Sequence, residues 1–251
     1  MITDHKNNLS ERLSIDGYFN EPVYVSKNLL DELSSLAIAD CRPEKIRHIG
    51  GSIVGHLNFS FGSLLRENLD QILPEYIIEI AKEYLKTDAL RVVLGGNVNL
   101  PGSVNQQWHA DALHSDQFLI ANIPLVDITN LNGPTEMLPG THTKDFKFAE
   151  FQRLRRNYPE SVVSLSGLNR GALHVRDSTL WHRGTANRSQ FIRPVITISL
   201  QRSQEDALIS EGLVGARSNS YSGKYFARHS RFYELLYWGL PWLGYLKKLI
   251  K

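Results

Sequence analysis

The sequence lacks the features that define several large classes of protein. Its 251 residues include one cysteine, Cys41, which excludes a disulfide framework and a cluster of thiolate ligands within the chain. No apolar run approaches the roughly 20 residues needed to cross a bilayer, and the polar N-terminal residues show no secretory signal. Lys and Arg number 28 against 26 Asp and Glu, so no excess of positive charge favours nucleic acid as a partner. These absences predict a globular, cytoplasmic protein that does not bind nucleic acid.

Nothing in the sequence divides the chain into parts. It contains no internal repeat, low-complexity segment or linker, and its length suits one domain with a large core, so we expect a single domain over residues 1–251. Leucines at helical spacing predict a helix over residues 28–39, with Ser26 as its cap. A broad apolar face predicts helical structure over residues 63–85, interrupted at Pro74.

From about residue 90 the pattern changes to that of strands. Short β-branched runs alternate with Gly, Pro and Asn, as in LRVVLGGNVNL, QFLIANIPLVDI, GALHVRD and RPVITISLQR. Helices followed by many short strands, without a repeating βαβ order, predict an α+β fold with a mainly β core over about residues 90–202. The apolar and aromatic residues at about 232–251 predict a C-terminal helical tail.

Residues 107–111, QWHAD, contain a His-x-Asp pair. If the segment is a strand, alternation places His109 and Asp111 on the same face, about 7 Å apart along the backbone. An imidazole and a carboxylate that project together suit a metal with mixed nitrogen and oxygen ligands, and a further histidine would complete a 2-His-1-carboxylate triad. For the isolated triplet, a polar pair in a loop is the more common explanation.

A second segment, LWHRGTANRS at residues 180–189, supplies a candidate third ligand. His182 ends an apolar run and precedes a Gly-containing turn, where a ligand can face the interior of a barrel. Arg193 follows in a β-branched run. An arginine binds a carboxylate through two parallel hydrogen bonds, and one that is buried needs such an anion because an unpaired buried charge is costly.

Taken together, these segments resemble the phytanoyl-CoA dioxygenase family of iron(II)- and 2-oxoglutarate-dependent oxygenases. The similarity runs through IDGY at residues 15–18, WHAD at 108–111, NGPTEMLPGTH at 132–142 and HRGTANRS at 182–189, and ends at Arg193. It implies a double-stranded β-helix, or jelly roll, with flanking N-terminal helices.

The resemblance also implies the chemistry and the residues that perform it. His109, Asp111 and His182 would hold one Fe(II), and Arg193 would bind the far carboxylate of 2-oxoglutarate. With O₂, such a site hydroxylates an unactivated C–H bond of a small or lipid-linked organic substrate and releases succinate and CO₂. Desaturation, epoxidation or ring formation would use the same residues. Asp111 argues against halogenation, because related halogenases carry a small residue at this position.

Other polar residues have weaker claims to the same site. Asn97, with Asn99 on the same strand face, and Thr135 are candidates for binding 2-oxoglutarate, although asparagines that stabilise turns are equally common. Among the histidines, we interpret His114 as a loop residue and His142 as exposed or structural. His174 has the same strand parity as His182 and is the reserve third ligand. The three histidines are therefore expected to lie outside the triad.

Two other functions fit the same residues. The chain could be a non-catalytic jelly-roll binding protein that kept its ligands, or a zinc hydrolase that uses the same triad. A hydrolase needs neither oxygen nor a keto acid, so metal content and succinate release separate the hypotheses. The sequence does not identify the substrate, because the expected selecting loops at residues 46–63, 144–166 and 204–225 carry no transferable motif.

The C-terminal tail carries a separate expectation, attachment to a membrane surface. Residues 235–246 contain no charged side chain, and their Trp and Tyr residues are amphipathic aromatics that favour a bilayer interface. Lys247, Lys248 and Lys251 follow, where they can meet anionic headgroups. The run is too short to span, so binding would be in the plane of the interface. A tail that packs on the jelly roll or forms an oligomer contact would bury the same aromatics.

Flotation with anionic liposomes tests the membrane hypothesis. The full chain is expected to float, and a chain truncated after Arg231 is expected to stay in the dense fraction. Equal partitioning of the two forms would exclude attachment through the tail, whereas insolubility of the truncated form would favour the packed tail.

Overall fold

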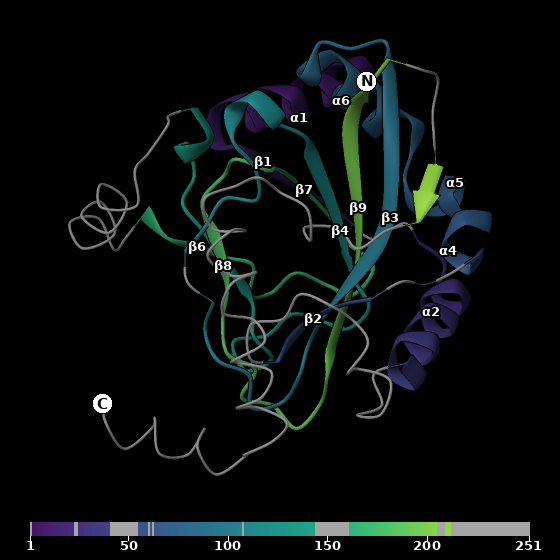
Figure 1. Ribbon diagram of the computed structural model, residues 1–251, viewed down its shortest axis with the longest axis vertical. Coiled ribbons are helices and arrows are strands. Elements are labelled where there is room, and N and C mark those ends of the chain that lie inside the picture. The colour runs from purple at the N-terminus through teal and green to yellow at the C-terminus, as the bar shows by residue number, and fades with distance from the viewer. Residues whose placement is uncertain are drawn as a thin grey trace.

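The computed structural model describes residues 2–22, 25–40, 55–59, 61, 63–106, 108–143, 161–204 and 209–211. Within them, a seven-stranded sheet forms the centre (Figure 1). Its strands in spatial order are β1 (Tyr18–Glu21), β7 (Leu173–Asp177), β4 (Leu119–Pro124), β9 (Arg193–Ser203), β3 (Ala89–Asn99) and β10 (Ile209–Glu211), with β2 (His56–Phe59) paired to the other end of β3. All neighbours are antiparallel except β10, which runs parallel to β3.

A smaller sheet faces the large one. It consists of β6 (Val163–Ser164), β5 (Thr135–Met137) and β8 (His182–Gly184), all antiparallel. Tyr18 of the large sheet packs in one apolar cluster with Met137 of the small sheet and with Leu165 and Leu180. Two facing, mainly antiparallel sheets agree with the predicted jelly roll. In the part of the chain that the structure describes, short 3-10 helices at His114–Asp116 and Thr141–Thr143 lie in the connections.

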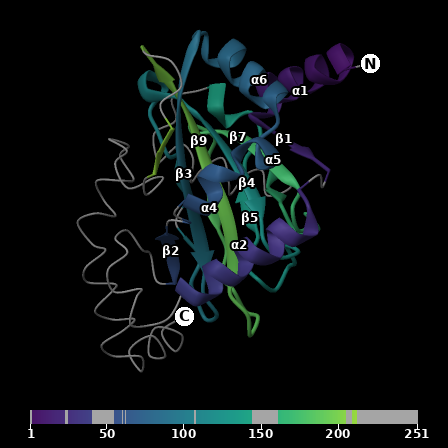
Figure 2. The same ribbon diagram turned by 90° about the vertical axis from the view of Figure 1, so that its right-hand side faces the viewer.

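Among the described residues, five helices cover the opposite face of the large sheet (Figure 2). They are α1 (Ile2–Asp16), α2 (Lys27–Asp40), α4 (Ser63–Glu67), α5 (Leu69–Ile72) and α6 (Glu75–Leu85). The main core cluster joins leucines and isoleucines of these helices to alternate strand residues, such as Leu173 and Val175. Because successive side chains of a strand point to opposite faces, His174 and Arg176 face the small sheet. The large sheet therefore has an apolar outer face and a partly polar inner face.

The predicted helices differ from the observed ones in detail. The helix expected at residues 28–39 is α2, and the Leu29 N–H donates to Ser26 Oγ at 3.4 Å, as the capping prediction required. Residues 63–85 break at Asn68 as well as at Pro74. Helix α1 was not predicted, because Leu9 and Leu13 alone among its described side chains are buried. The predicted C-terminal helix lies outside the described residues.

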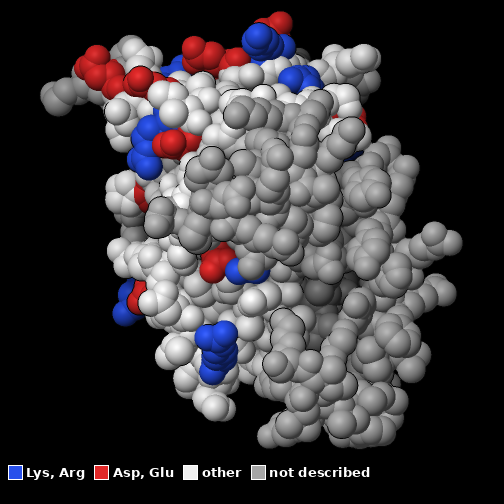
Figure 3. All heavy atoms as spheres, turned by 90° about the vertical axis from the view of Figure 1, so that its left-hand side faces the viewer, with Lys and Arg blue, Asp and Glu red and all other residues white. Residues whose placement is uncertain are grey.

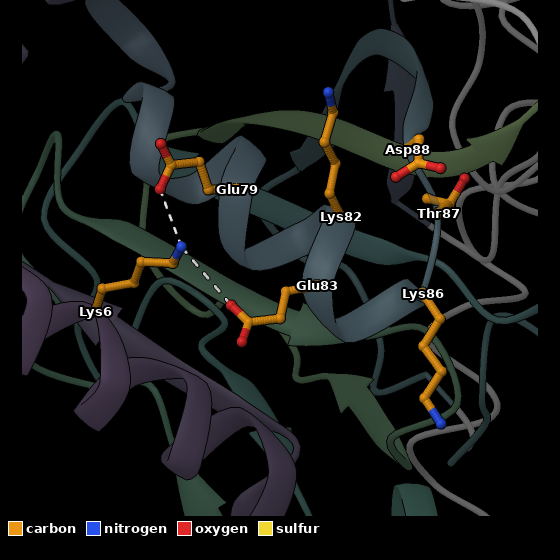
Figure 4. Close-up of a pocket in the computed structure, with 7 residues that line it drawn as sticks. All are labelled: Lys6, Glu79, Lys82, Glu83, Lys86, Thr87 and Asp88. Atoms are coloured by element: carbon orange, nitrogen blue, oxygen red, sulfur yellow. Dashed lines mark hydrogen bonds and ion pairs between the residues drawn. The ribbon is translucent and has the colours of Figure 1, made fainter.

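Polar contacts attach α1 to the rest of the structure. Lys6 lies in a surface groove between α1 and α6, where its ammonium is 3.0 Å from Glu79 and 3.7 Å from Glu83 (Figure 4). Such exposed ion pairs contribute little. The buried Glu21 carboxylate accepts hydrogen bonds from His5 Nε2 and Tyr76 Oη at 2.8 and 3.1 Å, and so links α1, β1 and α6.

The charged surface agrees with the composition. On the face drawn in Figure 3, side chains of both signs are scattered among uncharged ones over the described residues. None of the described helices is long and apolar enough to span a membrane.

Gly17 fixes how α1 leads into the barrel. Its φ of 83° lies in the left-handed region, and its N–H donates to Leu13 O. A Cβ at this position would lie 2.5 Å from Nδ1 of His142, a buried residue whose Nε2 donates to Ser14 O. His142 is thus structural, one of the two roles expected for it.

Gly17→Ala is expected to destabilise the protein by about 3 kcal/mol, because left-handed strain adds to the contact with His142. The measurement is the free energy of unfolding in urea. Gly167→Ala is the matched control, since Gly167 has φ of 93° but open space around its Cβ, and it should cost about 1 kcal/mol. Equal decreases in the free energy of unfolding of the two variants would show that the contact with His142 contributes nothing to the cost of Gly17→Ala.

Candidate metal centre

Two histidines and an aspartate converge between the sheets. His109 Nε2 lies 3.7 Å from Asp111 Oδ1, and His182 Nε2 lies 3.5 Å from Asp111 Oδ2. One potential ligand atom from each residue falls within 4.8 Å of the others, the one such group of three among the described residues. Bonds of about 2.1 Å around a metal bring neighbouring ligand atoms to about 3 Å, so a small contraction would complete the site.

The backbone places these ligands differently from the prediction. Residues 108–111 do not form a regular strand. Instead, His109 and His182 exchange two backbone hydrogen bonds of 3.0 and 2.9 Å as an isolated bridge at the edge of the small sheet. The Asp111 N–H then donates to Ser178 O at 2.7 Å. His109 and Asp111 therefore point to the same side because their backbone pairs with residues 178–182.

Two tryptophans pack beside these ligands. Trp108 is buried in a cluster with Leu138 and the partly buried Trp181, and the Arg183 guanidinium lies 4.9 Å from the centre of the Trp108 ring. The tryptophans on either side of the bridge therefore contribute to the core.

Hydrogen bonding and burial prepare His182 to bind a metal. Its Nδ1 donates to Leu180 O at 2.9 Å, which leaves the Nε2 lone pair for a metal. Burial, with the charge of Arg176, holds the pKa of His182 well below its usual value, so the imidazole is neutral.

Arg176 keeps Asp111 ionised. Burial alone would raise the pKa of the Asp111 carboxyl, but the charge of Arg176, with His182 and His109, outweighs it and lowers the pKa. The Arg176 guanidinium donates from Nη2 to Asp111 Oδ2 at 2.6 Å. Sequence reasoning missed Arg176, although the alternation of His174 and Arg176 in a buried strand was a readable signal.

Arg193 is buried without an internal counter-ion. Its side chain is 5% exposed, its Nε has no hydrogen-bond partner, and no described carboxylate lies within ion-pair distance. Burial lowers its pKa to about 10, so it stays charged at neutral pH. A buried guanidinium in this position needs an anion, which the fold itself does not supply among the described residues.

His56 lies near both Arg193 and His109. Burial, with the charges of those two residues, lowers the pKa of His56 to about 3. Its Nε2 donates to Val104 O at 2.8 Å. A Cβ at Gly184 would lie 2.8 Å from the His56 ring, so glycine is required there. The sequence placed this segment in a loop and gave no signal for His56.

The turn between His182 and Arg193 depends on Asn187. This fully buried side chain donates to Asn99 O and Phe191 O at 2.9 and 2.8 Å, and its Oδ1 accepts from the N–H and hydroxyl of Ser189. The Asn-x-Ser part of the distal motif therefore sets the turn that brings β9 back toward the site.

The remaining candidates are spread around this centre. Asn97 faces the same side of β3 as Asn99, and its amide donates to Asn58 at 3.3 Å. Asn99 is fully buried and donates to Thr185 O, which makes it a turn-stabilising residue. Thr135 lies opposite Gly184 in the small sheet, next to the His182 strand. Neither Asn97 nor Thr135 belongs to the metal group.

The other histidines lie outside the group as well. His114 donates from Nε2 to the carbonyl of His142 at 2.6 Å, within a connection. His174, the reserve ligand, lies on β7 of the large sheet, where its Nδ1 is 2.7 Å from Asn20 Oδ1. The structure therefore favours His182 over His174 as the third member of the triad.

Comparisons with known proteins agree with this geometry. A family model described as phytanoyl-CoA dioxygenase (PhyH) matches residues 63–195, just over half of the chain. The epimerase SnoN of nogalamycin biosynthesis is similar in structure, with a TM-score of 0.65 and 20% identity over 80% of this chain and 84% of that one. AviO1 from Streptomyces viridochromogenes has a TM-score of 0.61 and 20% identity, covering 79% and 96%. EctD from S. alaskensis has a TM-score of 0.61 and 15% identity, covering 82% and 87%.

Arg176→Met should destabilise the metal-free protein by about 3 kcal/mol, because it leaves the Asp111 carboxylate buried without its cation. Urea unfolding measures the loss. Arg170→Met is the matched control: Arg170 pairs with Asp31 at 2.7 Å in a more exposed position, so about 1 kcal/mol or less is expected. The double variant Arg176→Met/Asp111→Asn should recover most of the stability. A loss for Arg176→Met no larger than that of the control would refute the role of this ion pair.

Proposed function

Because the chain belongs to the phytanoyl-CoA dioxygenase family, we propose that it is an iron(II)- and 2-oxoglutarate-dependent oxygenase that hydroxylates a C–H bond of a small organic substrate. The observation that carries this proposal is the combination of the His109, Asp111 and His182 group with a buried Arg193 that lacks a counter-ion. The triad fits iron with positions left open, and the arginine fits a dicarboxylate. A zinc hydrolase would need the first feature alone.

The residues of the chain have distinct roles in this proposal. His109, Asp111 and His182 would hold Fe(II), and Arg193, with Asn97 and Thr135 as further candidates, would bind 2-oxoglutarate. Bound iron and 2-oxoglutarate supply the oxidation by O₂, with release of succinate and CO₂. Arg176 keeps Asp111 ionised and oriented, and the Leu180 carbonyl keeps the His182 Nε2 lone pair available. The side chains of His109, Asp111 and His182 are 12%, 18% and 7% exposed, which limits the access of bulk water to them.

Hydroxylation is the narrower part of the proposal. Proteins of similar structure include an epimerase, a carbocyclase and EctD in complex with 5-hydroxyectoine, so this fold accommodates several reaction outcomes. Hydroxylation requires no residue beyond the triad and the co-substrate residues named above. The hypothesis of a lipid-linked substrate rests on membrane attachment through the C-terminal tail, which lies outside the described residues. The flotation experiment tests that attachment.

The experiment compares 2-oxoglutarate binding and turnover in the wild type and in Arg193→Lys. The wild type should release succinate only with Fe(II), O₂ and 2-oxoglutarate present. Lysine keeps the charge but loses the planar pair of donors, so the affinity for 2-oxoglutarate in anaerobic calorimetry should fall roughly 30- to 1000-fold, about 2–4 kcal/mol.

Arg202→Lys, on the same strand, is the control, because Arg202 donates to the Leu85 carbonyl outside the site. It should leave the affinity for 2-oxoglutarate unchanged. An unaltered affinity in Arg193→Lys would remove Arg193 from the co-substrate site, and metal-dependent hydrolysis without succinate would favour the zinc alternative.

A further inference from the structure

A line of polar side chains crosses the inner face of the large sheet. Asn20, His174, Asn122 and Thr197 lie directly opposite one another on β1, β7, β4 and β9. Arg176 occupies the next inner position of β7, opposite Tyr18. His174 is 1% exposed and Arg176 is 7% exposed, so their polar atoms have little access to bulk water.

His174 presents a hydrogen-bond acceptor on this face. Its Nδ1 donates to Asn20 Oδ1 at 2.7 Å, because an amide oxygen only accepts. Burial, with the charge of Arg176, lowers the pKa of His174 to about 3, so the ring is neutral near pH 7. The Nε2 atom then carries a lone pair. It is buried, and no described residue donates a hydrogen bond to it.

Arg176 presents a donor on the same face, two residues along the strand. Its Nη2 is engaged by Asp111 Oδ2, whereas its buried Nη1 has no acceptor among the described residues. Buried polar atoms without partners are rare in folded proteins and call for a ligand or an ordered water. Here one unmet acceptor and one unmet donor lie on neighbouring inner positions beside the candidate metal centre.

We propose that His174 and Arg176 together bind a hydroxyl group of the substrate. The O–H donates to His174 Nε2, and its oxygen accepts from Arg176 Nη1. A carboxylate, including either end of 2-oxoglutarate, offers only acceptors near neutral pH, and an ammonium group offers only donors. A hydroxyl group satisfies both atoms, because it donates one hydrogen bond and accepts another.

The substrate of this oxygenase is therefore a hydroxylated compound, held with one existing hydroxyl close to the metal. The assignment of that hydroxyl to a substrate rests on the proposed function. An internal water presents the same O–H chemistry, and the experiment has to separate the two.

The experiment follows the ring nitrogens of His174 by NMR in the full chain, labelled with ¹⁵N-histidine and loaded with Zn²⁺ and 2-oxoglutarate. The probes are ethylene glycol, its dimethyl ether, which keeps the acceptors but lacks the O–H groups, and acetate. His174 should show a protonated Nδ1 and a bare Nε2. Ethylene glycol should move the Nε2 signal toward that of a hydrogen-bonded nitrogen, and the other two probes should not.

Two variants complete the design. Arg176→Lys should weaken the apparent affinity for ethylene glycol on the order of tenfold, the effect of about one lost hydrogen bond. Thr197→Val keeps the size of the side chain and removes a hydroxyl from the same polar line. It should leave the affinity for ethylene glycol unaltered. Loss of the response in Arg176→Lys alone supports the paired site.

Three outcomes would overturn the proposal: a bare Nδ1 in place of Nε2, no response to ethylene glycol, or an Nε2 that is already hydrogen-bonded and does not change, which would indicate an internal water. Iron-dependent succinate release, measured separately, distinguishes this failure from failure of the proposed function. A glycol response in a chain that releases no succinate would keep the hydroxyl site and reject the oxygenase.

Discussion

The ion pair between Asp111 and Arg176 is the interaction on which the rest of the site depends. A carboxylate enclosed between two sheets is unstable as an anion unless a cation accompanies it, and the 2.6 Å contact with the Arg176 guanidinium provides that cation. The pair leaves the Asp111 carboxylate ionised beside two imidazoles. One carboxylate oxygen and two imidazole nitrogens together form a ligand set that suits a divalent metal.

Alternate residues of the large sheet serve different purposes: those on the outer face form the apolar core, and those on the inner face line the candidate site. Outward residues such as Leu173 and Val175 join the helices in the main core, while inward residues such as His174 and Arg176 face the small sheet. A buried polar group is tolerable there only with a partner. The buried polar atoms of His174, Arg176 and Arg193 that lack partners among the described residues are therefore where we propose that ligands bind.

Sequence reasoning predicted the main strands and two helical regions from patterns that are local in the chain. The resemblance to the phytanoyl-CoA dioxygenase family indicated the three residues that the structure brings together. Sequence reasoning placed His109 and Asp111 on one side by assuming the alternation of a regular strand. Their segment is not a regular strand, and pairing with residues 178–182 orients the two side chains. The same reasoning missed α1, whose apolar stripe is narrow, and the approach of Arg176 to Asp111, which are 65 residues apart. Contacts of this kind depend on strand order, which a single sequence does not encode locally.

The most direct test of this account is the coordination of bound iron, measured by X-ray absorption together with iron content. The account predicts one Fe(II) per chain with two imidazole ligands and a carboxylate oxygen, and the loss of one imidazole, with weaker iron retention, in His182→Ala. An unchanged spectrum and an unchanged iron content in His182→Ala would contradict it.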